Sequence, residues 1–172
     1  MADEQADRAP TADELRALAE QVAGRCLALG VTVVTAESCT GGLVGHCLTE
    51  IPGSSTWFLG GVIAYDNAVK AGVLGVPAAT LAAHGAVSAQ TAVAMAEGAR
   101  RLLGASIAVS VTGIAGPGGG TEAKPVGLTY LAVADAAGDA VQRHVWPYDR
   151  SGDKRASAAA AMALVLARLE AA

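Results

Sequence analysis

Residues 31–42 read Val-Thr-Val-Val-Thr-Ala-Glu-Ser-Cys-Thr-Gly-Gly, and the order of residue types here indicates the fold class. Its β-branched first half predicts a buried strand over residues 31–36, and the segment from Leu43 to Glu50 has the spacing of a helix. The glycines between them supply a turn. A strand, a glycine turn and a helix in this order bring outward-facing backbone N–H groups to a helix N-terminus, where they favour an anion.

The same turn carries side chains that can act as acid, base or nucleophile. Glu37 could be a general base, or it could accept hydrogen bonds from the amides of its own turn. Cys39 could be a nucleophile if the helix terminus lowers its pKa. Together with Ser38, these residues suggest a site for a phosphorylated small molecule.

Outward from this stretch, helical and strand-like segments alternate. A capping-box pattern, Thr11 to Glu14, opens a helix over 12–29, which Gly30 ends. We expect further helices over 43–50, 67–74, 77–83, 89–103 and 151–171, and strands over 31–36, 56–65, 106–111, 126–134 and 140–146. Gly60-Gly61 suggests either a bulge or a close backbone approach in the second strand. The alternation predicts a single-domain layered α/β/α sandwich with a mixed, mostly parallel sheet over residues 11–172, after a disordered leader over residues 1–10.

Composition excludes several classes of function. The chain has 172 residues, a net charge of −4, no basic block and 3% aromatic residues, so nucleic acid is not an expected partner. It has no apolar run of about 18 residues and no export signal, so we expect no membrane partner and a cytoplasmic location. The three cysteines lack CxxC spacing, and no metal site is predicted.

Two further segments could carry chemistry together. Ser54 and Ser55 stand in a Gly-Ser-Ser turn, and Lys70 follows Tyr65 in a Tyr-x-Asn-x-x-Lys segment. A serine nucleophile needs a base, and a lysine serves if burial lowers its pKa. Tyr65 could then relay or orient the proton. Taken singly, the turn and the lysine are ordinary surface features.

Six segments in order resemble the CinA C-terminal domain family. They are Ala-Glu-Ser-Cys-Thr-Gly-Gly (36–42), Gly-Ser-Ser-x-Trp-Phe (53–58), Tyr-x-Asn-x-x-Lys (65–70), His-Gly-Ala-Val-Ser (84–88), Thr-Gly-Ile-Ala-Gly-Pro-x-Gly-Gly (112–120) and Lys-Pro-Val-Gly (124–127). The resemblance spans residues 12–170. Members include amidases that convert nicotinamide mononucleotide and water to nicotinate mononucleotide and ammonia. Larger members carry an additional N-terminal domain, so this chain resembles the stand-alone form.

The resemblance implies a serine–lysine amidase that needs no metal or cofactor and forms a homo-oligomer. By motif position, Ser55 is the expected nucleophile, Lys70 its base and Tyr65 a supporting catalytic residue; whether Ser38 is the nucleophile instead stays open. The implied substrate-binding residues are Ser38, Thr40, Gly41, Gly42, Thr112, Gly113 and Arg150.

Arg150 is the match to the arginine of a Gly-Asp-Arg segment in the family, although the glycine is replaced by Tyr148 here. The arginine could hold the nucleotide phosphate through a bidentate contact. The sequence is also compatible with two alternatives: a non-catalytic nucleotide-binding or regulatory module, and an amidase that acts on another phosphorylated or pyridine carboxamide.

Overall fold

The computed structural model describes residues 8–171, which form one five-stranded sheet flanked by helices. The strands are β1 (Val33–Glu37), β2 (Phe58–Ile63), β3 (Ile107–Gly113), β4 (Leu128–Asp135) and β5 (Gly138–Val145). The helices are α1 (Ala12–Leu29), α2 (Leu43–Thr49), α3 (Asn67–Gly72), α4 (Ala78–His84), α5 (Ala89–Leu103) and α6 (Arg150–Glu170), with a 3₁₀ turn, η1, at Ser54–Thr56. These bounds differ from the predicted ones by at most two residues at any end.

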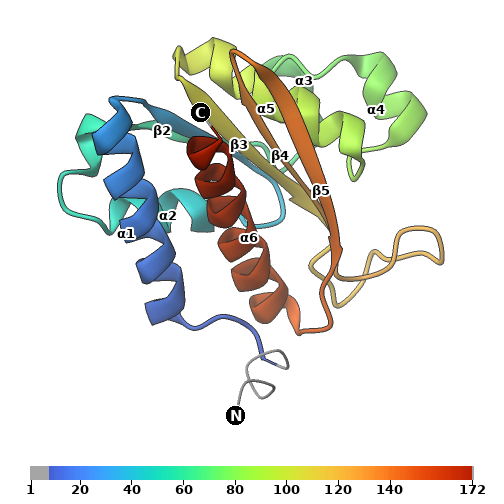
Figure 1. Cartoon of the computed structure of the whole chain (residues 1–172). Coiled ribbons are helices and arrows are strands. Elements are labelled where there is room, and N and C mark those ends of the chain that lie inside the picture. Colours follow the sequence, from blue (N-terminus) through green and yellow to red (C-terminus); the bar gives the residue numbers. More distant parts are fainter. Residues whose placement is uncertain (1–7, 172) are drawn as a thin grey trace.

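The sheet is mixed, as the sequence predicted. Its strand order is β2-β1-β3-β4-β5; β1 pairs in parallel with β2 and β3, whereas β4 and β5 are antiparallel additions. Helices α1, α2 and α6 cover one face, and α5 with the shorter α3 and α4 lies on the other (Figure 1). The predicted α/β/α sandwich is therefore confirmed.

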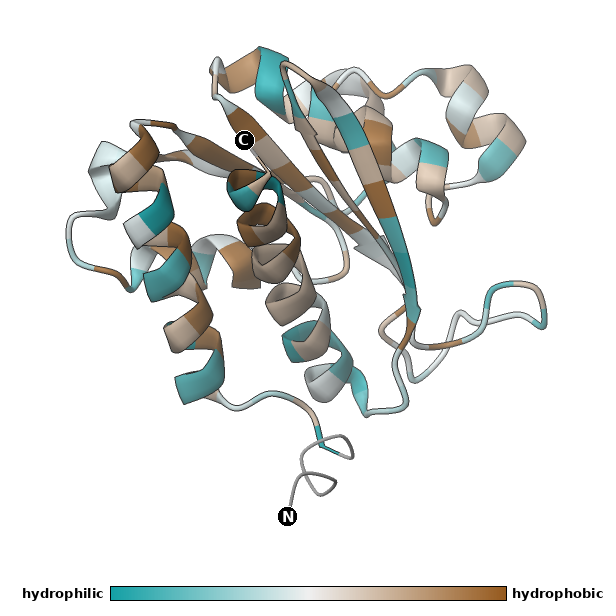
Figure 2. Ribbon diagram, in the orientation of Figure 1, coloured by the Kyte–Doolittle hydropathy of each residue, from teal (hydrophilic) through white to brown (hydrophobic). Residues whose placement is uncertain are grey.

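Alternation along the central strands divides the core into two layers. In β3, Ile107 and Val109 face α1 and α6, whereas Ala108 faces α5. The layer under α5 is built largely from alanines, which allow the helix to approach the sheet closely. Helix α5 also lies close to the chain that follows α3, because a Cβ on Gly98 would overlap the carbonyl oxygen of Leu74. The apolar colouring of the central strands in Figure 2 follows this double burial.

The pairing of β2 with β1 contains a bulge, one of the two features that Gly60-Gly61 suggested. Val33 pairs with Phe58, but Val34 pairs with Gly60, so Leu59 is an extra residue in β2. Gly60 has φ +134°, a backbone conformation that side-chain-bearing residues rarely adopt, and this explains why a glycine stands there.

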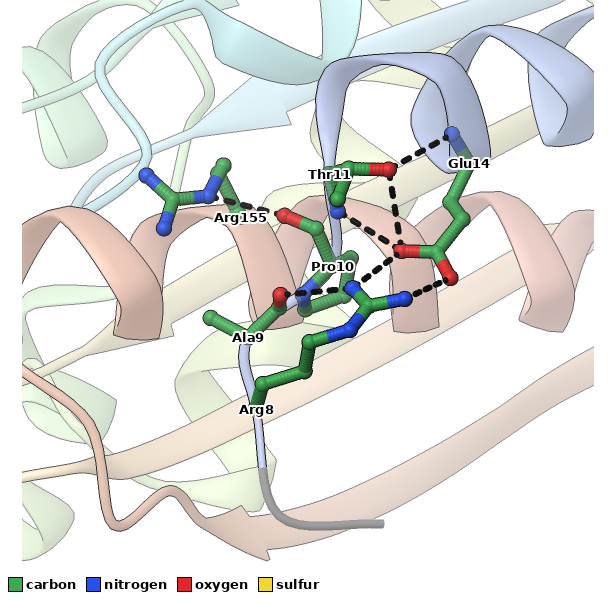
Figure 3. Close-up of polar contacts among 6 residues, drawn as sticks. All are labelled: Arg8, Ala9, Pro10, Thr11, Glu14 and Arg155. Atoms are coloured by element: carbon green, nitrogen blue, oxygen red, sulfur yellow. Dashed lines mark hydrogen bonds and ion pairs between the residues drawn. The ribbon is translucent and has the colours of Figure 1, made fainter. Parts of the chain in front are cut away.

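The start of the described chain is tied to two helices. The capping box between Thr11 and Glu14 is present, and Arg8 adds a bidentate pair to the Glu14 carboxylate, with distances of 2.8 and 2.9 Å (Figure 3). These contacts lower the pKa of Glu14 to about 2, chiefly through the hydrogen bonds from Arg8. The carbonyl of Pro10 accepts a bond from Arg155 of α6. Of the predicted leader over 1–10, residues 1–7 lie outside the described residues, and residues 8–10 are held in these contacts.

Between residues 8 and 171, no helix has the length and apolar character needed to cross a bilayer.

Candidate active site

A cavity of about 290 Å³ opens at the carboxyl ends of the three parallel strands. Ser38 and Cys39 follow β1, Tyr65 follows β2, and Thr112 and Gly113 end β3. Ligands gather at this edge of α/β sheets because the loops after neighbouring parallel strands converge there. The remaining walls come from α3, from the segment before α5, from the glycine loop between β3 and β4, and from the first residue of α6.

Ser38 and Lys70 meet in this cavity. The Lys70 Nζ lies 3.0 Å from the Ser38 Oγ, and it also donates to the carbonyls of Ala64 at 2.8 Å and Tyr65 at 3.1 Å. Backbone bonds fix both partners: the Ser38 amide donates to Val111 of β3, and the Ala64 amide donates to Glu37 of β1. Two adjacent strand ends therefore set the distance between the hydroxyl and the amine.

The amine of Lys70 lies in a buried environment. Its side chain is 1% exposed, and burial lowers its pKa, an effect opposed by the charge of Asp66 and by Cys39. Among residues 8–171 no carboxylate forms an ion pair with it. Nζ donates to the Ser38 Oγ and to both carbonyls; after loss of one proton, the two bonds to carbonyls would leave its lone pair free to accept the Ser38 hydroxyl proton, as a general base requires.

Cys39 also lines the cavity, but its thiol is poorly suited to nucleophilic attack. The side chain is 7% exposed, and burial raises its pKa to about 12. The thiolate is the reactive form of cysteine, so this environment keeps the thiol inert at neutral pH.

Ser55 does not lie near Lys70, which corrects the expected pairing of these two residues. Ser55 is exposed in η1, before the first residue of β2, whereas Lys70 contacts the carbonyls that follow the last residue of β2. The six residues of β2 stand between them, and at about 3.3 Å per residue they span roughly 20 Å. The predicted Ser55–Lys70 dyad is therefore wrong; the serine beside the lysine is Ser38.

The α2 N-terminus is occupied by Glu37, so it does not form the expected anion site. The buried carboxylate accepts bonds from the backbone amides of Gly42 at 3.1 Å, Val44 at 3.0 Å and Gly45 at 2.8 Å, and from the Thr40 hydroxyl at 2.6 Å. Of the two roles open to Glu37 from the sequence, the structure shows the hydrogen bonding of its own turn.

This arrangement also corrects the substrate-binding role predicted for three residues. The Thr40 side chain is fully buried on Glu37, the Gly42 amide donates to the same carboxylate, and the Gly41 amide donates to the Ser38 carbonyl. Positive φ values of +63° and +98° at Gly41 and Gly42 explain why glycines make this turn. All three shape the Ser38 turn and do not line the cavity.

Replacing Glu37 by glutamine should destabilise the fold by about 2–3 kcal/mol, because an amide group would then face backbone N–H donors at the buried N-terminus of α2. Denaturant unfolding measures the effect. Glu50→Gln is the matched control, since Glu50 is an exposed residue at the end of the same helix. Equal unfolding midpoints for the two variants would contradict the capping role.

Thr112 and Gly113 line the cavity as predicted, but the Thr112 hydroxyl is already committed. Its Oγ1 donates to the carbonyl of Ala86 at 2.7 Å, so its proton is not directed at a substrate oxygen. At Gly113, a Cβ would stand 2.7 Å from the carbonyl oxygen of Leu128 and 3.1 Å from the Cys39 Sγ. Only glycine fits between β4 and the Ser38 turn.

Tyr65 and Arg150 form the outer wall of the cavity. The Arg150 guanidinium donates to the Tyr65 hydroxyl at 3.0 Å and to the carbonyl of Gly116 at 2.7 Å. Tyr65 reaches Lys70 through its backbone carbonyl, whereas its phenol contacts Arg150. The structure thus brings Tyr65 to the cavity, with its hydroxyl bound to Arg150.

Several lining residues were not among the predicted site residues. Asn67 stands at the start of α3 and lines the cavity, and the glycine loop contributes Gly116, Gly118 and Gly119. Both segments were visible as motifs: the asparagine is the middle of Tyr-x-Asn-x-x-Lys, and a long glycine-rich loop after a strand is a common site component. Within residues 8–171, no three His, Cys, Asp or Glu side chains gather where they could hold a metal ion.

The comparisons with known proteins identify the family. The profile of the CinA C-terminal domain matches residues 15–169, and the chain belongs to this family. Two relatives are a competence-damage inducible protein of Desulforudis audaxviator, 59% identical over 69% of this chain, and a CinA-like protein of Leptospira borgpetersenii, 48% identical over 81%. The matched regions are 29% and 34% of those proteins, so the chain spans about a third of the length of these curated relatives.

Solved structures share the whole fold. A competence/damage inducible protein of Agrobacterium tumefaciens has a TM-score of 0.86 and 43% identity, with 94% of this chain and 97% of that chain covered. A CinA superfamily protein of Klebsiella pneumoniae has a TM-score of 0.89 and 32% identity, with 92% and 99% covered. The family indicated by the six motifs is confirmed.

Proposed function

We propose that this protein is an amidohydrolase that converts nicotinamide mononucleotide and water to nicotinate mononucleotide and ammonia, with Ser38 as nucleophile and Lys70 as general base. The observation that carries the proposal is the 3.0 Å contact between a buried lysine amine and the Ser38 hydroxyl in a cavity at the strand ends. The resemblance of the six motifs to amidases of the same family supports the substrate.

The residues suit two half-reactions. In the first, the Ser38 Oγ attacks the carboxamide carbon while Lys70 takes the hydroxyl proton; the C–N bond then breaks, and Lys70 returns the proton to the departing ammonia. In the second, a water attacks the resulting ester, Lys70 again takes and returns a proton, and the carboxylate product leaves. Both half-reactions are acyl transfers whose proton transfers are carried by one amine, and neither uses a cofactor.

The backbone amide of Cys39 is the proposed donor to the oxyanion. It directly follows the nucleophile, and among residues 8–171 no other residue accepts a hydrogen bond from it. A single such donor contributes roughly a hundredfold to a thousandfold in rate. Arg150, at the outer wall, is the proposed contact to the remainder of the nucleotide.

The test is incubation of the purified protein with nicotinamide mononucleotide, with ammonia measured enzymatically and nicotinate mononucleotide identified by chromatography. We expect both products in equal amounts. Nicotinamide and NAD serve as comparison substrates, and faster turnover of either would reassign the substrate. Calorimetric binding of the mononucleotide without ammonia release would support a non-catalytic module. The cytoplasmic location and the homo-oligomer stay predictions.

A further inference from the structure

A second, larger cavity adjoins the reactive one. Its volume is about 740 Å³, and the two cavities share Ala115 and Arg150 in their walls. Pro117, Val126 and Tyr148 give it apolar and aromatic sides. A ligand whose carboxamide lies at Ser38 can therefore continue past Arg150 into a space with room for a sugar and a charged group.

Two cations stand on the helical wall of this cavity. Arg150 and Lys154 are four residues apart in the first turns of α6 and so share one face of the helix. Within the described chain neither of them pairs with a carboxylate. Asp149 also lines the cavity, but its Oδ1 caps the helix by accepting the Gly152 amide at 2.7 Å. Like charges at this spacing repel, and cations near a helix N-terminus oppose its dipole, so a bound anion would relieve both effects.

Lys154 extends from α6 toward the reactive turn. Its half-buried side chain places Nζ 3.8 Å from the position that a Cβ on Gly41 would occupy. Gly41 is three residues from Ser38 and has no side chain to block the amine. The ammonium group thus lies between the second cavity and the turn that carries the nucleophile.

We propose that Lys154 binds the phosphate of the substrate in the second cavity and thereby selects phosphorylated carboxamides over the corresponding nucleosides. The inference rests on the proposed amidase function, because it takes the carboxamide at Ser38 as the other end of the ligand. Arg150 flanks the path, with donors directed at Tyr65 and Gly116, while Lys154 supplies a point charge with no protein acceptor among residues 8–171.

Lys154→Met tests this assignment, because methionine keeps much of the apolar stem and removes the charge. We expect KM for nicotinamide mononucleotide to rise tenfold or more, with kcat/KM for nicotinamide riboside unchanged. Lys154→Arg should restore most of the affinity. Arg101→Gln is the control for charge alone, since Arg101 is an exposed residue of α5 that lines neither cavity.

Calorimetry with ribose 5-phosphate separates this proposal from the amidase proposal. Binding that Lys154→Met abolishes supports the phosphate site even if no ammonia is released from the mononucleotide. Equal losses toward mononucleotide and riboside in Lys154→Met, or turnover of both at equal efficiency in the unmodified protein, would overturn the phosphate site and leave the amidase intact.

Discussion

Ser38→Ala should lower ammonia release from nicotinamide mononucleotide by about a thousandfold or more, because no other nucleophile in the cavity is poised to replace the hydroxyl. Lys70 donates to Ser38 at 3.0 Å, and the neighbouring thiol of Cys39 has a pKa raised to about 12 by burial. Steady-state kinetics with saturating substrate measures the loss.

Ser55→Ala is the matched control for this variant, since it makes the same substitution at the serine indicated by the Gly-Ser-Ser motif. Ser55 is exposed at the opposite end of β2, so we expect activity within about twofold of the unmodified protein. The reverse result, an inactive Ser55→Ala beside an active Ser38→Ala, would refute the assignment of the nucleophile.

Lys70→Arg should be nearly as damaging, by about a thousandfold, although it keeps the positive charge. A guanidinium does not lose its proton in proteins, so it cannot accept the proton of Ser38. Arginine is also larger than the buried amine that it replaces, so Lys70→Met is measured beside it, and circular dichroism reports whether each variant folds. Substantial turnover in either folded variant would remove Lys70 as the base.

The pH profile gives an independent readout of the same amine. A base acts only when deprotonated, so kcat/KM should be low at acidic pH and rise through the pKa of Lys70. Because burial lowers that pKa, the midpoint should fall below the usual 10.5. A profile that is flat from pH 6 to 10 would contradict a lysine base.

Much of the fold could be predicted because local signals agreed with one another. The capping box at Thr11 and Glu14 and the glycine at position 30 bound α1 as predicted, and the glycine pair in β2 marked its bulge. Parallel pairing of β1 with both β2 and β3 was not readable from the chain, because it depends on contacts between distant segments.

The predicted dyad failed for a reason already present in the predicted elements. A strand over 56–65 was expected between Ser55 and Lys70, and a strand separates the residues at its two ends by its full length. Ser38 instead follows β1, whose parallel pairing with β2 brings the two carboxyl ends together. The order of the motifs indicated the family. Which motif residues lie together depends on the strand directions, because residues that follow the carboxyl ends of parallel strands lie at the same edge of the sheet.

The role of Glu37 could be narrowed but not decided from sequence. A carboxylate beside a glycine turn suits both catalysis and capping, and the choice depends on where the side chain points. Its bonds to the amides of α2 show that the positive end of this helix is neutralised inside the protein. The anionic substrate of the proposed function would therefore find its charge partners elsewhere, for example in the cations on α6.

The bulge at Leu59 lies in the strand that leads to the carbonyls bound by Lys70. The extra residue is inserted near the start of β2, and every later residue of that strand is displaced by one position against β1. Ala64 and Tyr65, whose carbonyls hold the Lys70 amine, lie at the end of the displaced segment. The inserted residue therefore contributes to the length of chain between the start of β2 and the carbonyls that bind the Lys70 amine.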